Sequence, residues 1–324
     1  MSRRNQILVG VLVVQLLLAV VVFWPRGSKA GGGEAMLADL DQVIEITVQD
    51  NAGHSIVLTK LNGAWVLPEI DDYPVPADKV SALLEKLEAF TTSRLVTKTA
   101  SSHRRLKVAD DAFERRVRLK RQDGVVSTFY LGSSPNYGVI HIRLDKQNQV
   151  YMVSDLSLTD VGAQAAGWVD AVYLSIEREQ VVELTLENAN GEFVFTRSEN
   201  ASAGADDRIW SMAGLGEGET LSQNSVTALL NRVSTLRMIA PVGKQELPKY
   251  GLQYPRALVT VKTRDAEGNT HTVVLRVGAK DAESNQYTVI ASTSPYYVRV
   301  AEYAVQDFIE KTHQDFIEPP PAAQ

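Results

Sequence analysis

The second half of this chain repeats the first half. A helix-like run of apolar residues follows Trp65 and returns after Trp210, and its first members, Val80 and Val226, are 226 − 80 = 146 positions apart. The same separation joins Leu83 to Leu229, Leu84 to Leu230, Leu87 to Val233, Leu106 to Leu252, Gly132 to Gly278 and Tyr151 to Tyr297. One separation shared by sites so far apart indicates two copies of one domain, and the period is too long for a solenoid. We therefore predict two globular modules.

Each copy predicts an antiparallel sheet with one principal helix. Apolar alternation from Val43 to Val48 leads into short strand-like runs separated by Asn and Gly, which is typical of a meander. The repeated apolar run has the i, i+3, i+4, i+7 spacing of a helix that packs on a sheet. Asp78 and Asn224 are the expected N-caps. Strands should return around the hairpin turns at Asp123-Gly124 and Glu267-Gly268-Asn269.

The joint between the copies is expected to hold a short helix and a buried aromatic residue. Residues 155–166 have a helix-like pattern, and Trp168 follows directly. We expect Trp168 to fill the interface between the modules.

An apolar segment precedes both copies. It runs from Ile7 to Trp24, 24 − 7 + 1 = 18 residues without a charge, and as a helix it would span about 27 Å, close to the hydrocarbon thickness of a bilayer. The alternative is a signal peptide cleaved after the small residues Ser28 and Ala30. The run exceeds the usual length of a signal-peptide core, so we expect an uncleaved signal anchor.

The orientation of this anchor follows from the residues that flank it. Arg3 and Arg4 precede the segment, and Arg26 and Lys29 follow it. The count is nearly tied, and the α-amino group favours an inward N-terminus. We expect a single-pass protein of the cytoplasmic (inner) membrane with its body on the extracytoplasmic, periplasmic side.

The fold class that follows is α+β, an N-terminal transmembrane helix followed by two tandem repeats of an antiparallel-sheet-plus-helix module. The expected division of the chain is a transmembrane anchor (1–25), a flexible linker (26–38), a first repeat (39–170), a second repeat (171–312) and a Pro-rich tail (313–324).

Composition excludes several classes of function. The hydrophobic fraction of 44% and the charged fraction of 22% are those of a folded protein. The net charge of −6 argues against nucleic acid as a partner. The densest basic cluster, His103, Arg104, Arg105 and Lys107, is expected to be a solvated loop. Cysteine is absent, which excludes disulfides, thiolate metal sites and thiol nucleophiles.

No catalytic, cofactor-binding or metal-binding residues are predicted, and no cofactor. The five histidines lack the spacing of a helical zinc site, and no nucleophile elbow occurs. An acidic loop (Glu69, Asp71, Asp72) has only part of a calcium pattern, and a Gly-rich loop (Gly214, Gly216, Gly218) carries Glu217 and Glu219, which oppose an anion. The pairs Asp110/Asp111 and Asp206/Asp207 are expected to lie in solvated turns.

Several of these marks together resemble a bacterial family called domain of unknown function 4340. They are the N-terminal segment, Trp65 before the helix, Tyr130-Leu131-Gly132, Tyr151-Met152-Val153 and Trp168-Val169-Asp170. The resemblance covers nearly all of the chain after the anchor. It implies an envelope protein that accompanies an ABC-type permease and a gliding-motility-type component, and it implies no catalytic residues.

Three hypotheses of function remain open. The first is a non-enzymatic accessory or scaffold subunit of an ABC-type transport or gliding-motility-like assembly, with the membrane and a permease or other envelope protein as partners. The second is an extracytoplasmic module that binds cell-wall glycan or peptide through Tyr137, Tyr250, Tyr254 and Tyr296. The third is an enzyme whose site is assembled from residues far apart in the sequence.

Overall fold

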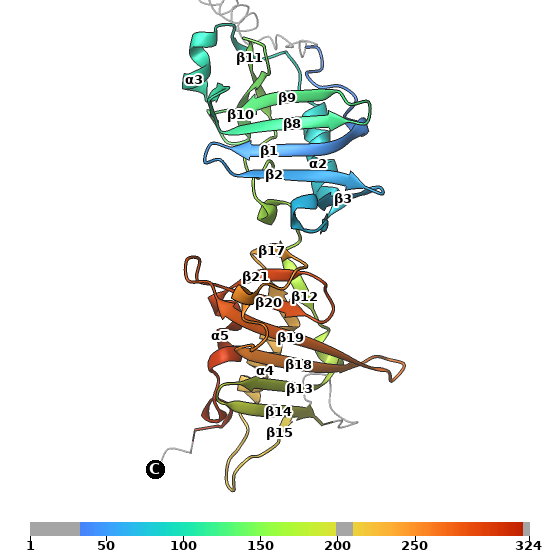
Figure 1. Cartoon of the computed structure of the whole chain (residues 1–324), viewed down its shortest axis with the longest axis vertical. Helices are drawn as coiled ribbons and strands as arrows, with labels where there is room; N and C mark the ends of the chain where they lie inside the picture. The colour runs from blue at the N-terminus through green and yellow to red at the C-terminus, as the bar shows by residue number, and fades with distance from the viewer. Residues whose placement is uncertain (1–32, 199–209, 320–324) are drawn as a thin grey trace, which may run out of the picture.

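Two large antiparallel sheets lie end to end along the molecule (Figure 1). The computed structural model describes residues 33–198 and 210–319. Strands in antiparallel sheets dominate and helices are few, which confirms the prediction of an α+β fold built on antiparallel sheets. The expected anchor (1–25) lies outside the described residues. Among the helices that are described, none is both long and apolar enough to cross a membrane.

The first sheet has nine strands in the order β4-β3-β2-β1-β8-β9-β10-β11-β5. Their bounds are β1 Val43–Asp50, β2 Ser55–Leu61, β3 Ala64–Leu67, β4 Tyr73–Val75, β5 Leu95–Thr97, β8 Arg115–Arg121, β9 Val126–Leu131, β10 Val139–Leu144 and β11 Val150–Ser154. Smaller elements accompany this sheet: η1 Leu40–Gln42, η2 Pro68–Ile70, α2 Ala77–Glu88, η3 Ala100–Ser102, α3 His103–Leu106, and the hairpin of β6 Val108–Ala109 with β7 Ala112–Phe113.

The second sheet has eight strands in the order β15-β14-β13-β18-β19-β20-β21-β17. Their bounds are β13 Val181–Asn188, β14 Gly191–Arg197, β15 Trp210–Met212, β17 Ala240–Gly243, β18 Ala257–Arg264, β19 Thr270–Lys280, β20 Gln286–Ala291 and β21 Tyr297–Ala301. The remaining elements are η4 Ala165–Gly167, η5 Arg178–Gln180, α4 Gln223–Ser234, η7 Pro248–Tyr250, α5 Glu302–Glu310, η8 His313–Phe316, and β12 Val172–Ser175, which pairs with β16 Thr235–Arg237.

The two sheets correspond strand for strand, apart from β4, down to their irregularities. β1 pairs with β8 through a bulge between Val43 and Glu45, and β13 pairs with β18 through the same bulge between Val181 and Glu183. Beside the bulge, Glu45 is paired with Lys120, and Glu183 with Lys262. A bulge re-aims a strand and is retained where that geometry matters, so the repeat extends to local backbone detail.

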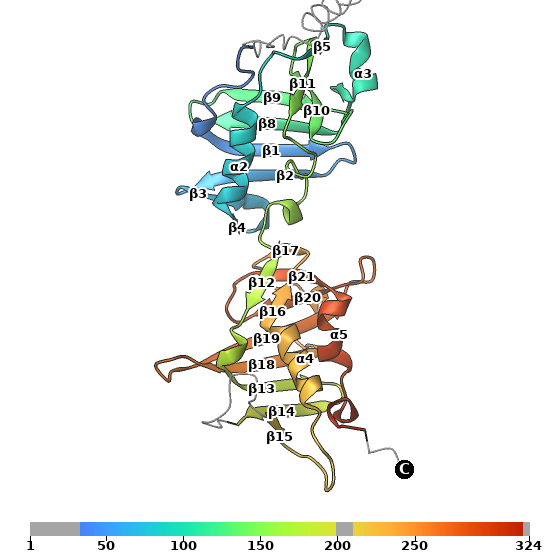
Figure 2. The ribbon, with the colours of Figure 1, turned by 180° about the vertical axis from the view of Figure 1, so that it is seen from behind.

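An amphipathic helix, α2 in the first copy and α4 in the second, lies over one face of each sheet, and in the second copy α5 lies beside α4 (Figure 2). The inward stripe of α2 buries Val80, Leu83 and Leu87, and the stripe of α4 buries its counterparts. The expected N-caps are wrong, because both helices begin earlier than predicted. Pro76 precedes α2 without a side-chain cap, and Ser222 caps α4 by accepting from Ser225 N. Asp78 lies in the first turn, where its charge favours the positive end of the helix.

The repeated glycines mark the place where a crossover segment lies directly on the sheet. A Cβ atom at Gly132 would collide with the carbonyl oxygen of Leu106, and one at Gly278 with that of Tyr250. Both segments run from the edge strand back to the middle of their sheet, through α3 in the first copy and η7 in the second. Only glycine permits so close a backbone approach.

The connection after the last strand differs between the copies. In the second copy it forms α5, whereas residues 155–164 form turns and bends and only the short η4 comes after them, so the helix expected over residues 155–166 is wrong. A polar link is nevertheless shared. Lys86 of α2 binds Asp160 at 2.7 Å, and Arg232 of α4, its counterpart at 232 − 86 = 146, binds Asp307 of α5 at 3.1 Å.

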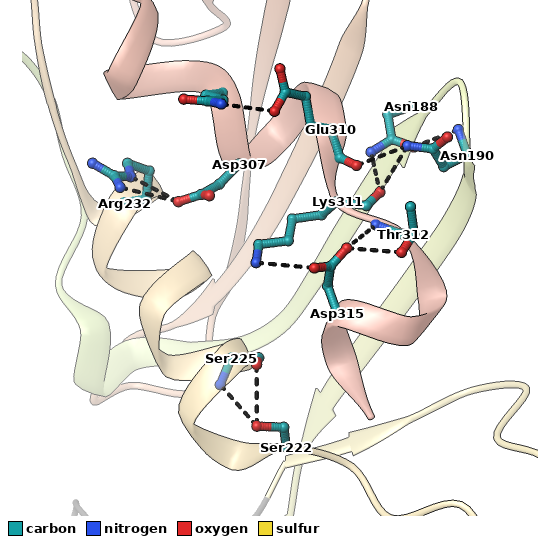
Figure 3. A network of polar contacts seen from close by, with 11 residues as sticks. Asn188, Asn190, Ser222, Ser225, Arg232, Asp307, Glu310, Lys311, Thr312 and Asp315 are labelled. Atoms are coloured by element: carbon teal, nitrogen blue, oxygen red, sulfur yellow. Dashed lines mark hydrogen bonds and ion pairs between the residues drawn. The ribbon is translucent and has the colours of Figure 1, made fainter. Parts of the chain in front are cut away.

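The segment assigned to a Pro-rich tail (313–324) is in part folded. Phe316 is fully buried against Phe193 and Phe195, and the carbonyl of Phe316 accepts from Ser222 N. Figure 3 shows how the segment is held: the side-chain amides of Asn188 and Asn190 donate to the last carbonyls of α5, and Thr312 and Asp315 form a capping box for η8. Residues 320–324 lie outside the described part.

The segment assigned to a flexible linker (26–38) also differs from expectation over its second half. Thr92 N donates to the carbonyl of Glu34, and Met36 N donates to that of Phe90. Met36 and Leu37 are buried. The apolar side chains of these two residues draw the chain onto the first sheet, so the described chain starts beside Phe90–Ser93, next to β5.

Gly132→Ala and Gly278→Ala should each lower the free energy of unfolding by roughly 1–3 kcal/mol or more, because the new methyl group must displace backbone. Chemical denaturation of the purified protein measures the loss. Gly167→Ala is the matched control, since its Cβ would meet only ordinary contact distance, 3.6 Å from Gly162 Cα. Equal stability of Gly278→Ala and the control would contradict this packing argument.

Candidate functional site: the junction between the sheets

The junction joins one edge of each sheet through an acidic loop. Asp71 follows η2 of the first sheet, and its Oδ2 atom accepts from the backbone N–H of Lys244 at 2.6 Å, directly after β17. Gly243, with a φ of 101°, has its Cα so close to this carboxylate that an added Cβ would lie 2.6 Å from Oδ2. Glycine at this turn therefore makes room for the carboxylate.

Tyr296 forms the second half of this contact. Its hydroxyl donates to the carbonyls of Asp71, at 3.2 Å, and Asp72, at 2.8 Å. The ring of Tyr296 packs edge-on against Tyr73, with centroids 4.6 Å apart, and the ammonium of Lys244 lies 4.8 Å from the centre of the same ring. Carboxylate, hydroxyl and ring contacts thus converge on three consecutive positions, Asp71, Asp72 and Tyr73, and the Lys244 ammonium steadies the Tyr296 ring.

A cluster of half-buried tyrosines supports the junction from behind. Tyr73 OH points to Met238 Sδ at 3.7 Å, and Tyr173 OH donates to the carbonyl of Tyr296 and accepts from Ala291 N. Burial raises the pKa of the Tyr73 hydroxyl to about 12, with smaller contributions from Tyr173, Tyr296 and Asp170. Burial likewise raises the pKa of the Tyr173 hydroxyl.

The covalent connector is fixed to the first sheet's helix. Lys79 of α2 donates to the carbonyls of Val169, at 2.6 Å, and Gly167, at 3.4 Å. Trp168 is fully buried, and its Nε1 donates to the carbonyl of Gly162. A hollow of about 300 Å³ lies between α2 and this connector. Trp168 thus holds the connector in place beside α2 and the junction.

The acidic loop that was considered for calcium is part of this junction. Asp71 is committed to Lys244 N, and within residues 33–198 and 210–319 no group of three or more His, Asp or Glu residues is arranged to hold a metal ion. The Gly-rich loop is closed on itself instead: Glu219 accepts from Gly216 N, and His313 Nε2 lies 2.8 Å from Glu219 Oε2. The His313 contact and the Gly216 N–H lower the pKa of the Glu219 carboxyl.

The four tyrosines considered for ligand stacking are not on one surface. Tyr250 is buried in a small cluster with Leu252 and Tyr297, and Tyr296 belongs to the junction. Tyr137 and Tyr254 are well exposed, one on each sheet's side of the molecule.

The basic cluster is more structured than expected, whereas Asp110 and Asp111 lie exposed in the turn between β6 and β7, as predicted. His103–Leu106 is a short helix, and the buried His103 ring contacts the carbonyl of Asn148. Asp110 pairs with Arg143, whose guanidinium is buried and stacks 4.4 Å from the Tyr130 ring centre. No sequence pattern predicts that Arg143 is buried and paired, because its partners come from three separate segments. Asp206 and Asp207 lie outside the described residues.

The geometry of the chain can now be set beside known proteins. The family model described as Domain of unknown function (DUF4340) matches residues 65–255, more than half of the chain. The protein belongs to this family. No curated protein and no solved structure matches the chain.

Asp71→Ala should loosen the junction without unfolding either sheet, because it removes the acceptor of the Lys244 N–H and leaves both cores intact. Hydrogen–deuterium exchange followed by mass spectrometry should show faster exchange for peptides that contain Lys244. Glu69→Ala is the control, an exposed acidic residue of the same loop. Unchanged protection in Asp71→Ala would show that the carboxylate does not hold the junction.

The junction should also weaken in alkali through Tyr73. An unfolded tyrosine ionises near pH 10, whereas the folded side chain ionises near 12. The stability that Tyr73 contributes is therefore complete below pH 10 and is lost as the pH rises from 10 to 12. Urea denaturation at pH 8, 10 and 11.5 should show a steeper decline for the natural protein than for Tyr73→Phe. Parallel curves would refute the assignment.

Proposed function

We propose that the protein is a single-pass, membrane-anchored, extracytoplasmic scaffold subunit that accompanies an ABC-type transport or gliding-motility-like assembly. In this proposal it sits in the cytoplasmic membrane with its body on the periplasmic side and acts without catalysis. The observation that carries the proposal is the junction, which binds two copies of one module into one elongated body. Such a body offers a long surface to a partner rather than a single pocket.

The position of the chain entry supports a role beside a membrane. The described chain starts at Gly33, at the end of the first sheet that lies away from the second sheet. The uncharged segment 7–24 ends 34 − 24 = 10 residues before Glu34, and ten residues reach at most about 35 Å. If that segment crosses a bilayer, the first module is kept close to the membrane surface and the second projects away from it.

The sequence provides an alternative, a module for cell-wall glycan or peptide. Only Tyr137 and Tyr254 of its four tyrosines are exposed for stacking, and they belong to different sheets. The scaffold proposal accounts for the junction between the modules and for the position of the chain entry, which the binding-module alternative leaves unexplained.

The test is affinity purification of the full-length, C-terminally tagged protein from mildly solubilised native membranes, followed by mass spectrometry. We expect a permease and its ATPase to be enriched above a control that carries residues 1–32 alone fused to the tag. Recovery of the full-length protein with no membrane protein enriched above the control would sink the scaffold proposal and favour the polymer-binding alternative.

A further inference from the structure

The two copies present the same edge to different surroundings. β5 and β17 are equivalent edge strands, since Leu95 and Pro241 are 241 − 95 = 146 positions apart. Each is bulged against its neighbour, between Leu95 and Thr97 in β5 and between Pro241 and Gly243 in β17. A lysine follows each strand, Lys98 in the first copy and Lys244 in the second. The geometry of the edge is therefore shared.

In the second copy this edge binds an acidic loop. The carboxylate of Asp71 accepts from the N–H that follows β17, and the ammonium of Lys244 lies over the ring of Tyr296, which itself holds the loop carbonyls. The loop places its own carboxylate at the end of the bulged strand β17. It does not add a further strand to the sheet. A blunt edge that resists strand addition can thus still bind a partner.

In the first copy the same edge is basic, and no strand of residues 33–198 and 210–319 pairs with its outer side. Leu95 and Val96 are 43% and 40% exposed, and Arg94 and Lys98 flank them with exposed side chains. Residues 89–109 contain five cations and no carboxylate, although the whole chain carries a net charge of −6. The cations are Arg94, Lys98, Arg104, Arg105 and Lys107. Two of them are paired within the module, Arg104 with Asp111 and Lys107 with Glu114.

We infer that the β5 edge, residues 94–98, is a docking site for a carboxylate-bearing loop of the membrane partner, of the same chemistry as the Asp71–Asp72 loop. The inference rests on the proposed function for the existence of that partner. Its position agrees with this, because Glu34 and Ala35 contact Thr91 and Thr92 immediately before β5. Charge selects the occupant: two cations flanking an apolar pair favour an acidic loop and oppose a second copy of the same basic edge.

The experiment combines charge reversal with zero-length crosslinking of the full-length protein in native membranes. A water-soluble carbodiimide joins a lysine amine to a carboxylate as an amide, and the carbodiimide takes up the water as a urea. We expect Lys98 to be joined to an Asp or Glu of a co-purified membrane protein. Lys98→Arg should keep the partner and abolish the crosslink, since it retains the charge but has no amine.

The double variant Arg94→Glu/Lys98→Glu should recover at least about tenfold less partner than the natural protein, because two attractions become repulsions. The matched control is Lys60→Glu/Arg118→Glu, which makes the same change of charge at two exposed positions on strands of the same sheet. Thermal unfolding of both variants checks that they fold like the natural protein.

The outcomes separate this inference from the proposed function. Equal recovery of the partner by the natural protein and by the edge variant would overturn the docking site and leave the scaffold role standing. Equal loss in both double variants would show unspecific charge attraction and overturn it as well. No partner in any sample would refute both proposals. Binding to vesicles of anionic phospholipid that is lost in the edge variant, without a Lys98 crosslink to protein, would replace the protein loop by the membrane surface.

Discussion

Each half of the molecule depends on an amphipathic helix that is buried across one face of its sheet, α2 in the first half and α4 in the second. Fully burying a Val or Leu side chain stabilises a fold by roughly 1.5–3 kcal/mol, and α2 and α4 each bury a stripe of these residues. The helix must also be held along the sheet, and both copies do this with a cation in the last turn. Lys86 and Arg232 each bind an aspartate of the segment that follows the last strand. That segment is turns in one copy and a helix in the other, so the ion pair is retained where the backbone is not.

The helix covers a face of its sheet, so the contacts between one sheet and other parts of the molecule are made by the edge strands. The first sheet ends in β4, which contains Pro74, and the second in β17, which contains Pro241. Proline removes a backbone donor and discourages strand addition. These two edges meet through side chains that bond to the N–H of Lys244 and to the carbonyls of Asp71 and Asp72, and β4 and β17 belong to separate sheets. At the far edge of the second sheet, the side-chain amide of Gln223 occupies both backbone groups of Trp210.

The periodicity of apolar residues predicted most of the strands and helices. The residue types along the chain predicted little of the junction between the sheets. Strands, hairpin turns and both helices follow from apolar spacing and from Asn-Gly or Asp-Gly turns, because these signals are local. Residues 155–166 do not form the predicted helix, because turns alone bury their apolar members Leu156 and Val161. The start of the first module and the burial of Phe316 depend on partners distant in the chain. The junction could not be found either, since Asp71 and Lys244 are 173 positions apart.

The duplication gives the junction a meaning beyond the joining of two modules. Both copies contain the same bulged edge strand, but the residues of this strand and their surroundings differ between the copies. In the second copy, Pro241 and Gly243 shape the edge around a carboxylate of the same chain. In the first copy, Leu95 and Thr97 stand at these positions and cations surround them. Charged side chains alone would protect an edge strand from aggregation. The exposed apolar pair between the cations has no such purpose, because exposing apolar side chains to water is unfavourable. An acidic loop that covers this edge accounts for the apolar pair and for the cations.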